Sequence, residues 1–107
     1  MDCMNRIELR GRVGSSGVIA VGGTAVAHVA LCTSHVLKDA SGRPEIETTW
    51  HNVTVWRDRM RGRLEDIGKG SVLRVAGRMR GHTYIGSDGL ERRSYEVVAD
   101  EAELVGG

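Results

Sequence analysis

Apolar and polar side chains alternate along much of the chain, the pattern of strands that face a core on one side and water on the other. Residues 5–13, 24–34 and 47–57 each show this period of two. Residues 14–17, Gly-Ser-Ser-Gly, are expected to end the first strand. The turn-rich segment 38–44, which holds the only proline, is expected to join the second and third strands as a long hairpin.

The period changes after the third strand. Met60, Leu64 and Ile67 recur at the spacing of one face of a helix. Asp58 is placed to cap the first turn, and Gly68 is placed to end the last one. A short helix is therefore predicted before the alternation resumes.

Two further strands are predicted in the rest of the chain, over residues 71–80 and 94–105, joined by a glycine-punctuated hairpin over 81–90. The strand over 71–80 has one apolar face and one basic face. Leu73, Val75 and Met79 lie on the apolar face, and Arg74, Arg78 and Arg80 lie on the basic face. Three strands, a helix over 58–67 and two strands is the order of an all-β, five-stranded oligonucleotide-binding (OB) barrel. An immunoglobulin-like sandwich has no place for the helical period.

The two tryptophans, Trp50 and Trp56, lie on one face of the predicted third strand, together with Asn52 and Thr54. At a rise of about 3.3 Å per residue, their indoles would stand roughly 20 Å apart. Spaced flat rings beside cations form a surface on which the bases of an unpaired nucleic-acid strand stack. The alternative is that one or both indoles fill the core, which is the commoner place for an isolated tryptophan.

Length and composition indicate one soluble domain, because 107 residues with 40% hydrophobic content bury only a modest core. No run approaches the ~20 apolar residues that cross a bilayer. The first six residues lack the apolar stretch of a secretion signal, so a cytosolic protein is expected. Cys3 and Cys32 are then interpreted as reduced thiols.

The net charge of +1 conceals an uneven distribution. Residues 1–95 carry 15 basic and 10 acidic side chains, and 13 of the 15 are arginine. The planar arginine fork suits phosphate and also stacks on bases, which favours a polyanionic partner. A GC-rich genome is an equally good reason for the same bias.

The segments that resemble catalytic motifs do not have the residue spacing that those motifs require. Residues 62–70 have five residues between the glycine and the Gly-Lys pair of a phosphate loop, and a glycine follows the lysine where Ser or Thr is needed. His28 and Cys32, four apart on a strand, would be ~13 Å apart and unable to share a zinc ion. We therefore expect a binding protein rather than an enzyme, with no metal and no cofactor.

A series of short motifs extends over nearly the whole chain. They occupy residues 4–14 (MNRIELRGRVG), 23–27 (GTAVA), 33–34 (TS), 49–53 (TWHNV), 69–71 (KGS), 77–80 (GRMR) and 95–98 (YEVV). In order and spacing they resemble the N-terminal domain of the bacterial single-stranded DNA-binding protein family. The resemblance implies one OB-fold domain over residues 1–107 that binds single-stranded DNA without sequence specificity, in replication, recombination and repair.

The resemblance also implies roles for individual residues. Base stacking would fall to Trp50, Trp56 and Tyr84. Phosphate or base contacts would come from five cations: Arg6, Lys38, Arg74, Arg78 and Arg80. The chain departs from the family at Leu37 or Val36, where a further tryptophan is common, at a shorter loop over residues 14–22, and at His82-Thr83, where a more basic pair is usual.

His51 matches a family histidine near the contact between subunits, and the resemblance implies a homotetramer, with a dimer as the smaller assembly. Without the resemblance, a strand histidine is more often a hydrogen-bonded core residue. The sequence stops at Gly106-Gly107, where the family's disordered linker and acidic tip would begin. The expected form is therefore tailless, whether by nature or by shortening, and tail-dependent recruitment of replication and repair enzymes is not expected.

Two other functions remain open at this stage. A tailless OB-fold adaptor of replication restart would act mainly through protein contacts. RNA binding on the same surface is also compatible, because stacking tolerates either sugar. In each case the expected location is the bacterial cytoplasm, in association with the nucleoid.

Overall fold

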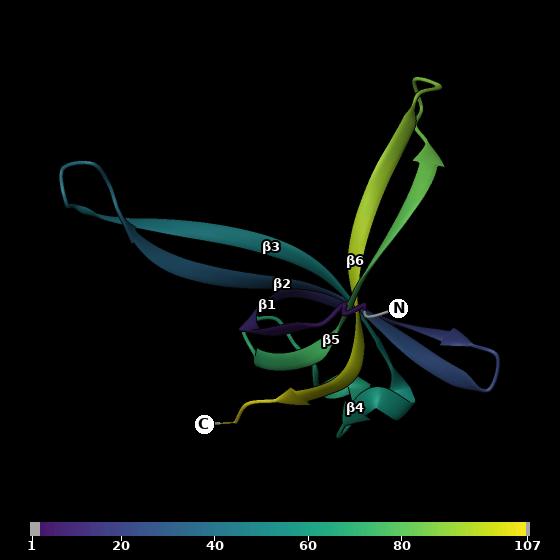
Figure 1. Cartoon of the computed structure of the whole chain (residues 1–107). Coiled ribbons are helices and arrows are strands. Elements are labelled where there is room, and N and C mark those ends of the chain that lie inside the picture. Colours follow the sequence, from purple (N-terminus) through teal and green to yellow (C-terminus); the bar gives the residue numbers. More distant parts are fainter. Residues whose placement is uncertain (1–2, 107) are drawn as a thin grey trace.

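The computed structural model describes residues 3–106 and shows a small β-barrel from which hairpins project (Figure 1). Residues 1–2 and 107, which belong to the predicted domain of 1–107, lie outside the described range. The strands are β1 (Ile7–Val21), β2 (Thr24–Lys38), β3 (Pro44–Trp56), the two-residue β4 (Met60–Arg61), β5 (Val72–Ile85) and β6 (Glu91–Leu104). The all-β prediction is confirmed.

The five long strands close on themselves. Strand β1 pairs antiparallel with both β2 and β5, β2 with β3, and β5 with β6. A parallel pairing of Val53 with Val97 and of Thr54 with Val98 joins β3 to β6 and completes the barrel. This is the predicted OB-fold barrel, and closure leaves the long strands without an open edge where they surround the core.

The core is aliphatic. Its largest fully buried side chains come from β1, β2, β3, β5 and the segment around β4: Val13, Leu31, Val53, Val55, Leu64, Leu73 and Val75. On β3, Val53 and Val55 point inward, so Trp50 and Trp56 point outward, as the alternation predicts. The indoles are therefore excluded from the barrel interior.

The predicted helix over 58–67 is wrong. Two 3-10 turns, Arg57–Arg59 and Leu64–Asp66, flank the short strand β4, in which Met60 pairs with Ala102 of β6. Gly62 has a φ of +102°, which a helix does not accommodate. The apolar residues with helical spacing are buried after all, but they anchor an irregular segment to the barrel.

The predicted strand ends are wrong in one respect: the strands are longer. Residues 14–17 do not end β1. The pairing of β1 with β2 shifts register between Val13 and Ser15 and then continues to a turn at Gly22, whose φ is +58°. The loop predicted over 38–44 is confirmed over 39–43, because Lys38 and Pro44 already pair as strand residues. Asp39 closes this loop by accepting hydrogen bonds from Ser41 and Arg43.

Hairpin ends therefore extend beyond the barrel as three arms, which we name by their strands: β1–β2, β2–β3 and β5–β6 (Figure 1). The pairing of β5 with β6 also shifts register, between Ala76 and Gly77, within the barrel, since Ala99 and Val97 beyond the shift belong to the core. No helix in residues 3–106 is long and apolar enough to cross a membrane.

Close backbone contacts at two glycines permit this closure. A Cβ on Gly77 would lie 2.0 Å from the carbonyl oxygen of Val98, and one on Gly11 would lie 2.2 Å from that of Cys32. Neither glycine has a positive φ. Both are therefore required for space rather than for backbone conformation.

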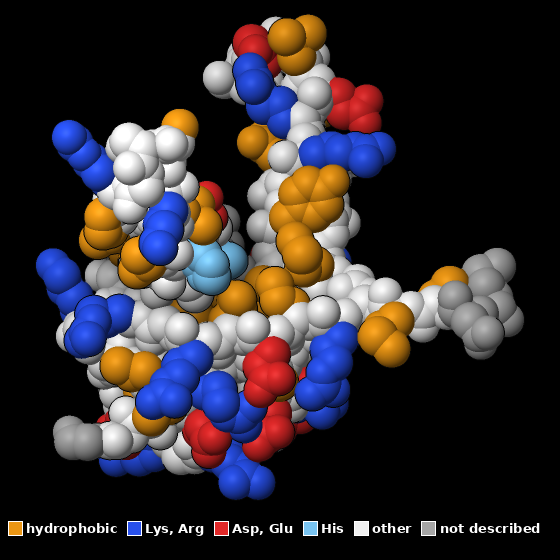
Figure 2. Space-filling model, turned by 60° about the vertical axis from the view of Figure 1, so that its left-hand side comes forward, with side chains coloured by type: hydrophobic (Ala, Val, Ile, Leu, Met, Phe, Trp, Pro, Cys, Tyr) orange, Lys and Arg blue, Asp and Glu red, His pale blue; other side chains and the backbone are white. Residues whose placement is uncertain are grey.

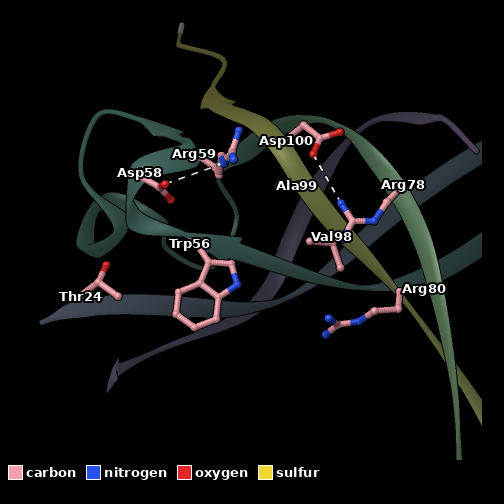
Figure 3. A pocket seen from close by; sticks show the side chains of 9 residues that line it. All are labelled: Thr24, Trp56, Asp58, Arg59, Arg78, Arg80, Val98, Ala99 and Asp100. Atoms are coloured by element: carbon pink, nitrogen blue, oxygen red, sulfur yellow. Dashed lines mark ion pairs between the residues drawn. The ribbon is translucent and has the colours of Figure 1, made fainter. Parts of the chain in front are cut away.

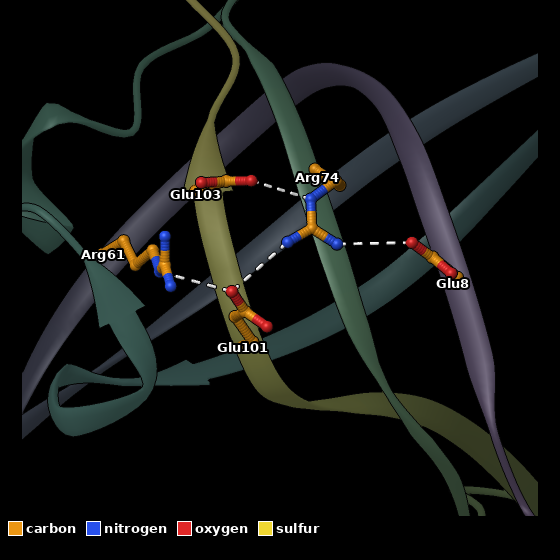
Figure 4. A network of polar contacts seen from close by, with 5 residues as sticks. All are labelled: Glu8, Arg61, Arg74, Glu101 and Glu103. Atoms are coloured by element: carbon orange, nitrogen blue, oxygen red, sulfur yellow. Dashed lines mark hydrogen bonds and ion pairs between the residues drawn. The ribbon is translucent and has the colours of Figure 1, made fainter.

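A cluster of arginine and glutamate side chains lies on the outer surface of the barrel and connects several of its strands (Figure 4). The Arg74 guanidinium contacts Glu103 at 2.8 Å and both Glu8 and Glu101 at 3.3 Å. Arg61 reaches Glu101 at 3.3 Å. The cluster links β1, β4, β5 and β6, and Arg74 is only 27% exposed. The hydrogen bond from Arg74 lowers the pKa of Glu103 below its ordinary 4.5.

Substitution of Gly77 by alanine tests the close contact. We expect Gly77→Ala to lower the free energy of unfolding by about 1–3 kcal/mol, because the Val98 backbone must move. Urea denaturation followed by circular dichroism measures this change. Gly17→Ala is the matched control, since its Cβ would meet nothing within 4 Å, and its stability should stay equal or rise by up to about 1 kcal/mol. Equal stability of the two variants would contradict the packing argument.

The Arg74 cluster predicts an acid-sensitive contribution to stability. Because the folded pKa of Glu103 is lowered, its contribution is present above the unfolded pKa and is lost as pH falls through the folded value. The stability of Glu103→Gln should therefore fall less steeply than that of the wild type below about pH 4.5. Urea midpoints between about pH 3 and 7 measure this, with Glu91→Gln, exposed at the start of β6, as control. Parallel curves for wild type and Glu103→Gln would refute the prediction.

Candidate nucleic-acid interface

Trp50 lies on the outer face of β3, and 62% of its surface is exposed. Its indole rests against β1 at Gly14, where a Cβ would lie 2.6 Å from the ring atom Cζ3. The ring is thus supported on one side by backbone, and its remaining surface is open to solvent. An exposed, supported ring of this kind suits stacking by a planar ligand.

Trp56, at the end of β3, is half-buried in the wall of an open cavity of about 490 Å³ (Figure 3). Three arginines share this cavity: Arg59 from the 3-10 turn and Arg78 and Arg80 from β5. The remaining lining residues are Thr24, Asp58, Val98, Ala99 and Asp100. An indole and three guanidinium groups therefore line one hollow, although the sequence pointed only to Arg78 and Arg80.

Each of these arginines has an acidic partner. Arg78 lies 3.8 Å from Asp100, and Arg59 lies 3.9 Å from Asp58. Arg80 donates from Nε to Glu96 at 2.9 Å. The three cations are therefore held in place and partly neutralised, and an incoming phosphate would have to compete with carboxylates for them.

Glu96 is the most enclosed of these carboxylates. Burial raises the pKa of Glu96, but hydrogen bonds from Thr54 and Arg80 outweigh it, so the pKa is lowered overall. Thr54 donates to Glu96 at 2.6 Å across the parallel β3–β6 pair. Glu96 therefore stays ionised at neutral pH and ties Arg80 to the middle of the outer β3 face.

Tyr84 lies far out on the β5–β6 arm, opposite Arg92, and is 47% exposed. Its ring centroid lies 6.5 Å from that of His82, with the planes at 47°. Because Arg80, His82 and Tyr84 alternate along β5, they share one face of the arm. The structure thus puts Tyr84 on the same face as Arg80, beyond the Trp56 cavity.

The other candidate cations are dispersed. Arg6 is exposed just before β1, and Lys38 is exposed at the end of β2, near the tip of the β2–β3 arm. Arg74 belongs to the charge cluster on the barrel and does not line the Trp56 cavity. The structure brings together Trp56, Arg78 and Arg80, but not Arg6, Lys38 or Arg74.

His51 is half-buried on β3, opposite Leu31, with its Nε2 at 2.9 Å from Oγ1 of Thr33. This contact explains the side-chain position within one chain. Its placement at a contact between subunits stays a prediction. Leu37 is exposed near the end of β2.

Two residues beside Trp50 were not among the sequence candidates. Met79 and Tyr95 line a smaller hollow of about 130 Å³ together with Trp50. By alternation, Met79 lies on the same strand face as the buried Val75, and Tyr95 lies on the same face as the buried Val97. Met79 is nevertheless 44% exposed, and Tyr95 is 55% exposed. The reason is that β5 and β6 continue past the barrel, where a core-facing register opens to solvent. Alternation alone could not reveal this.

The space between the arms forms a recess on one face of the molecule. Figure 2 shows hydrophobic side chains at its base and along the upright β5–β6 arm, with Lys and Arg side chains around them. Apolar rings bordered by cations have the composition of a surface for single-stranded nucleic acid.

The model of the single-strand binding protein family matches residues 4–105. The single-stranded DNA-binding protein of Neisseria meningitidis serogroup A is 32% identical over 106 residues, covering 97% of this chain. Single-stranded DNA-binding protein B of Bacillus subtilis is 36% identical over 83 residues, covering 78% of this chain and 72% of its own length. The chain spans 61% of the length of the Neisseria relative.

Solved structures agree on the fold. The SSB of Plasmodium falciparum, solved in complex with single-stranded DNA, has a TM-score of 0.80 at 22% identity, covering 98% of this chain and 96% of its own. A deletion mutant of the single-stranded DNA-binding protein from Thermus aquaticus has a TM-score of 0.78 at 21% identity, covering 97% of this chain and 51% of its own.

The family match extends over almost the whole described chain, from before β1 to just past the end of β6. The matching family is one of binding proteins rather than enzymes, in line with the motif spacing. The chain belongs to the single-strand binding protein family.

Proposed function

We propose that this chain binds single-stranded DNA with little dependence on sequence, by stacking bases on exposed aromatic rings and pairing phosphates with arginines. The observation that carries the proposal is the outward, supported indole of Trp50 on β3, which lines a hollow together with Met79 and Tyr95. Relatives at 32–36% identity are named for single-stranded DNA binding.

Stacking contributes most of the affinity in this proposal. A stacked base contributes roughly 1–3 kcal/mol on alanine substitution, so Trp50, Trp56 and Tyr84 supply on the order of 3–9 kcal/mol. Phosphate contacts at Arg78 and Arg80 contribute less net free energy, because each arginine already has a carboxylate partner. The ion pairs therefore leave the rings as the main source of binding.

The same balance favours single strands over duplex. In a duplex, paired bases stack on one another and hide the faces that the rings need, so only the phosphate contacts remain. The cations around Trp56 are partly neutralised, which leaves weak attraction for a duplex backbone. The protein therefore discriminates single strands from duplex by whether the base faces are accessible, and not by recognising particular bases.

The proposal covers residues 1–107 as one binding domain. It places the protein in the bacterial cytoplasm with the nucleoid, in replication, recombination and repair, since the named relatives above are bacterial DNA-binding proteins. Arg6 and Lys38 would contact the DNA strand at the edges of the binding surface. Assembly into a homotetramer is part of the proposal and is tested by analytical ultracentrifugation.

Removal of either indole tests the stacking role. Trp50→Ala and Trp56→Ala should each weaken binding of a dye-labelled dT oligonucleotide by about 5- to 150-fold, the equivalent of roughly 1–3 kcal/mol. Fluorescence anisotropy measures the affinity. In the wild type, poly-dT should also quench tryptophan emission.

Leu90→Ala is the matched control, because Leu90 is also 62% exposed but lies in the turn of the β5–β6 arm. It should bind like the wild type. If both tryptophan variants keep full affinity and a native melting temperature, the stacking role is refuted.

Removal of one guanidinium tests the phosphate role. Arg78→Gln should make the dependence of log Kd on log salt concentration shallower by about 0.7, the value for one phosphate of a single strand. Arg78 suits this test because its ion pair with Asp100 is long, at 3.8 Å. Arg61→Gln, in the charge cluster of the barrel, removes the same charge and should leave the slope unchanged. A slope that changes equally in both variants would indicate a general charge effect.

A further inference from the structure

Trp50 and Tyr95 leave the barrel side by side. Strands β3 and β6 run parallel where Val53 pairs with Val97, so residues just before these positions emerge at the same end of the barrel. Trp50 and Tyr95 occupy those positions, and both line the hollow of about 130 Å³. The closure of the barrel therefore fixes which two aromatic rings border this hollow.

Both rings are supported in the same way. As Gly14 supports Trp50, Gly81 supports Tyr95: a Cβ on Gly81 would lie 2.9 Å from the ring atom Cε1. Neither glycine has a positive φ, so the backbone conformation does not require glycine at either site. The missing Cβ atoms instead give room for the rings to lie against neighbouring strands, which restricts ring rotation before any ligand binds.

The hollow that Trp50 and Tyr95 line is open and suited to a flat ligand. Within residues 3–106, the one ring pair in contact range is His82 with Tyr84, so Trp50 and Tyr95 do not stack on each other. Met79 supplies an apolar surface, while Asn52 and Glu96 provide polar groups at the border. The volume suits one nucleobase rather than a longer ligand.

A cation lies next to Tyr95. Arg93 lines a neighbouring hollow together with Tyr95 and Gly81, on the same face of the β5–β6 arm. In the part of the chain that the structure describes, Arg93 has no ion pair, unlike Arg80 and Arg92 on the same arm. Its guanidinium is therefore available to a phosphate beside the base without displacing a carboxylate.

We propose that Trp50 and Tyr95 form a slot that holds a single base of the bound strand between two rings, with Arg93 on the adjoining phosphate. The inference rests on the proposed binding of single-stranded DNA and adds Tyr95 and Arg93 to the residues that contact it. A base in the slot is covered on both faces, whereas Trp56 and Tyr84 each offer one. The slot is thus the most tightly held position along the strand.

The test compares Tyr95→Phe and Tyr95→Leu with the wild type, by anisotropy of a dye-labelled dT oligonucleotide. Tyr95→Phe keeps the ring and should bind within about twofold of the wild type, whereas Tyr95→Leu should bind about 5- to 150-fold more weakly. Melting temperatures show whether each variant is folded. Gly81→Ala, which retains Tyr95 but displaces its ring, should give a smaller loss, with Gly17→Ala as control.

Double variants distinguish a slot from two separate platforms. If one base needs both rings, Trp50→Ala with Tyr95→Leu should bind about as weakly as Trp50→Ala alone, because the first loss already frees the base. Trp56→Ala with Tyr95→Leu should instead show the product of the two single losses. Multiplying losses in both pairs would overturn the slot, leaving Tyr95 as an independent platform.

The outcomes separate this inference from the proposed function. Wild-type affinity in Tyr95→Leu and Gly81→Ala, with weakened binding in Trp50→Ala, overturns the slot and leaves single-stranded DNA binding intact. Failure of the wild type to bind dT oligonucleotides overturns the proposed function itself. Arg93→Gln should reduce the salt dependence by about one single-strand phosphate, or about 0.7; an unchanged slope removes Arg93 from the site.

Discussion

The closure of the barrel by the parallel pairing of β3 with β6 is the constraint on which the rest of the structure depends. In the neighbouring pair of β5 with β6, the backbones lie so close at the register shift that Gly77 has no room for a Cβ beside Val98. The small interior is then filled by valine and leucine side chains. Indoles on the opposite face of β3 can only lie outside, so the packing of the core is also what presents the aromatic surface.

In the arms, the alternation of side chains that fills the core inside the barrel exposes side chains to solvent instead. Inside the barrel, Val97 faces the core; two residues earlier on the same face of β6, Tyr95 is exposed beside Trp50. On β5, Met79 continues the register of Leu73 and Val75, yet it is 44% exposed. One continuous strand therefore supplies both core and binding surface, and the point at which it leaves the barrel decides the role of each side chain.

Much of this fold could be predicted from sequence, because strand alternation is a local property. The period of two identified the five long strands and the outward face of Trp50. Alternation did not predict the structure where long-range contacts determine it. The segment around Gly62 has helical spacing, but pairing with β6 holds it in a non-helical conformation. The length of each arm likewise depends on pairing with the partner strand. The engagement of Arg74 by Glu8, 66 residues away, is equally absent from local patterns.

The ion pairs give the proposed binding a particular physical character. Arg59, Arg78 and Arg80 meet carboxylates in the free protein, so a phosphate that binds them exchanges one anionic partner for another. Such an exchange yields little net attraction, but it excludes ligands that bring charge without exposed bases. Stacking then determines whether a strand stays bound, and the arginines determine where its backbone runs. A surface arranged in this way selects unpaired strands without reading their sequence.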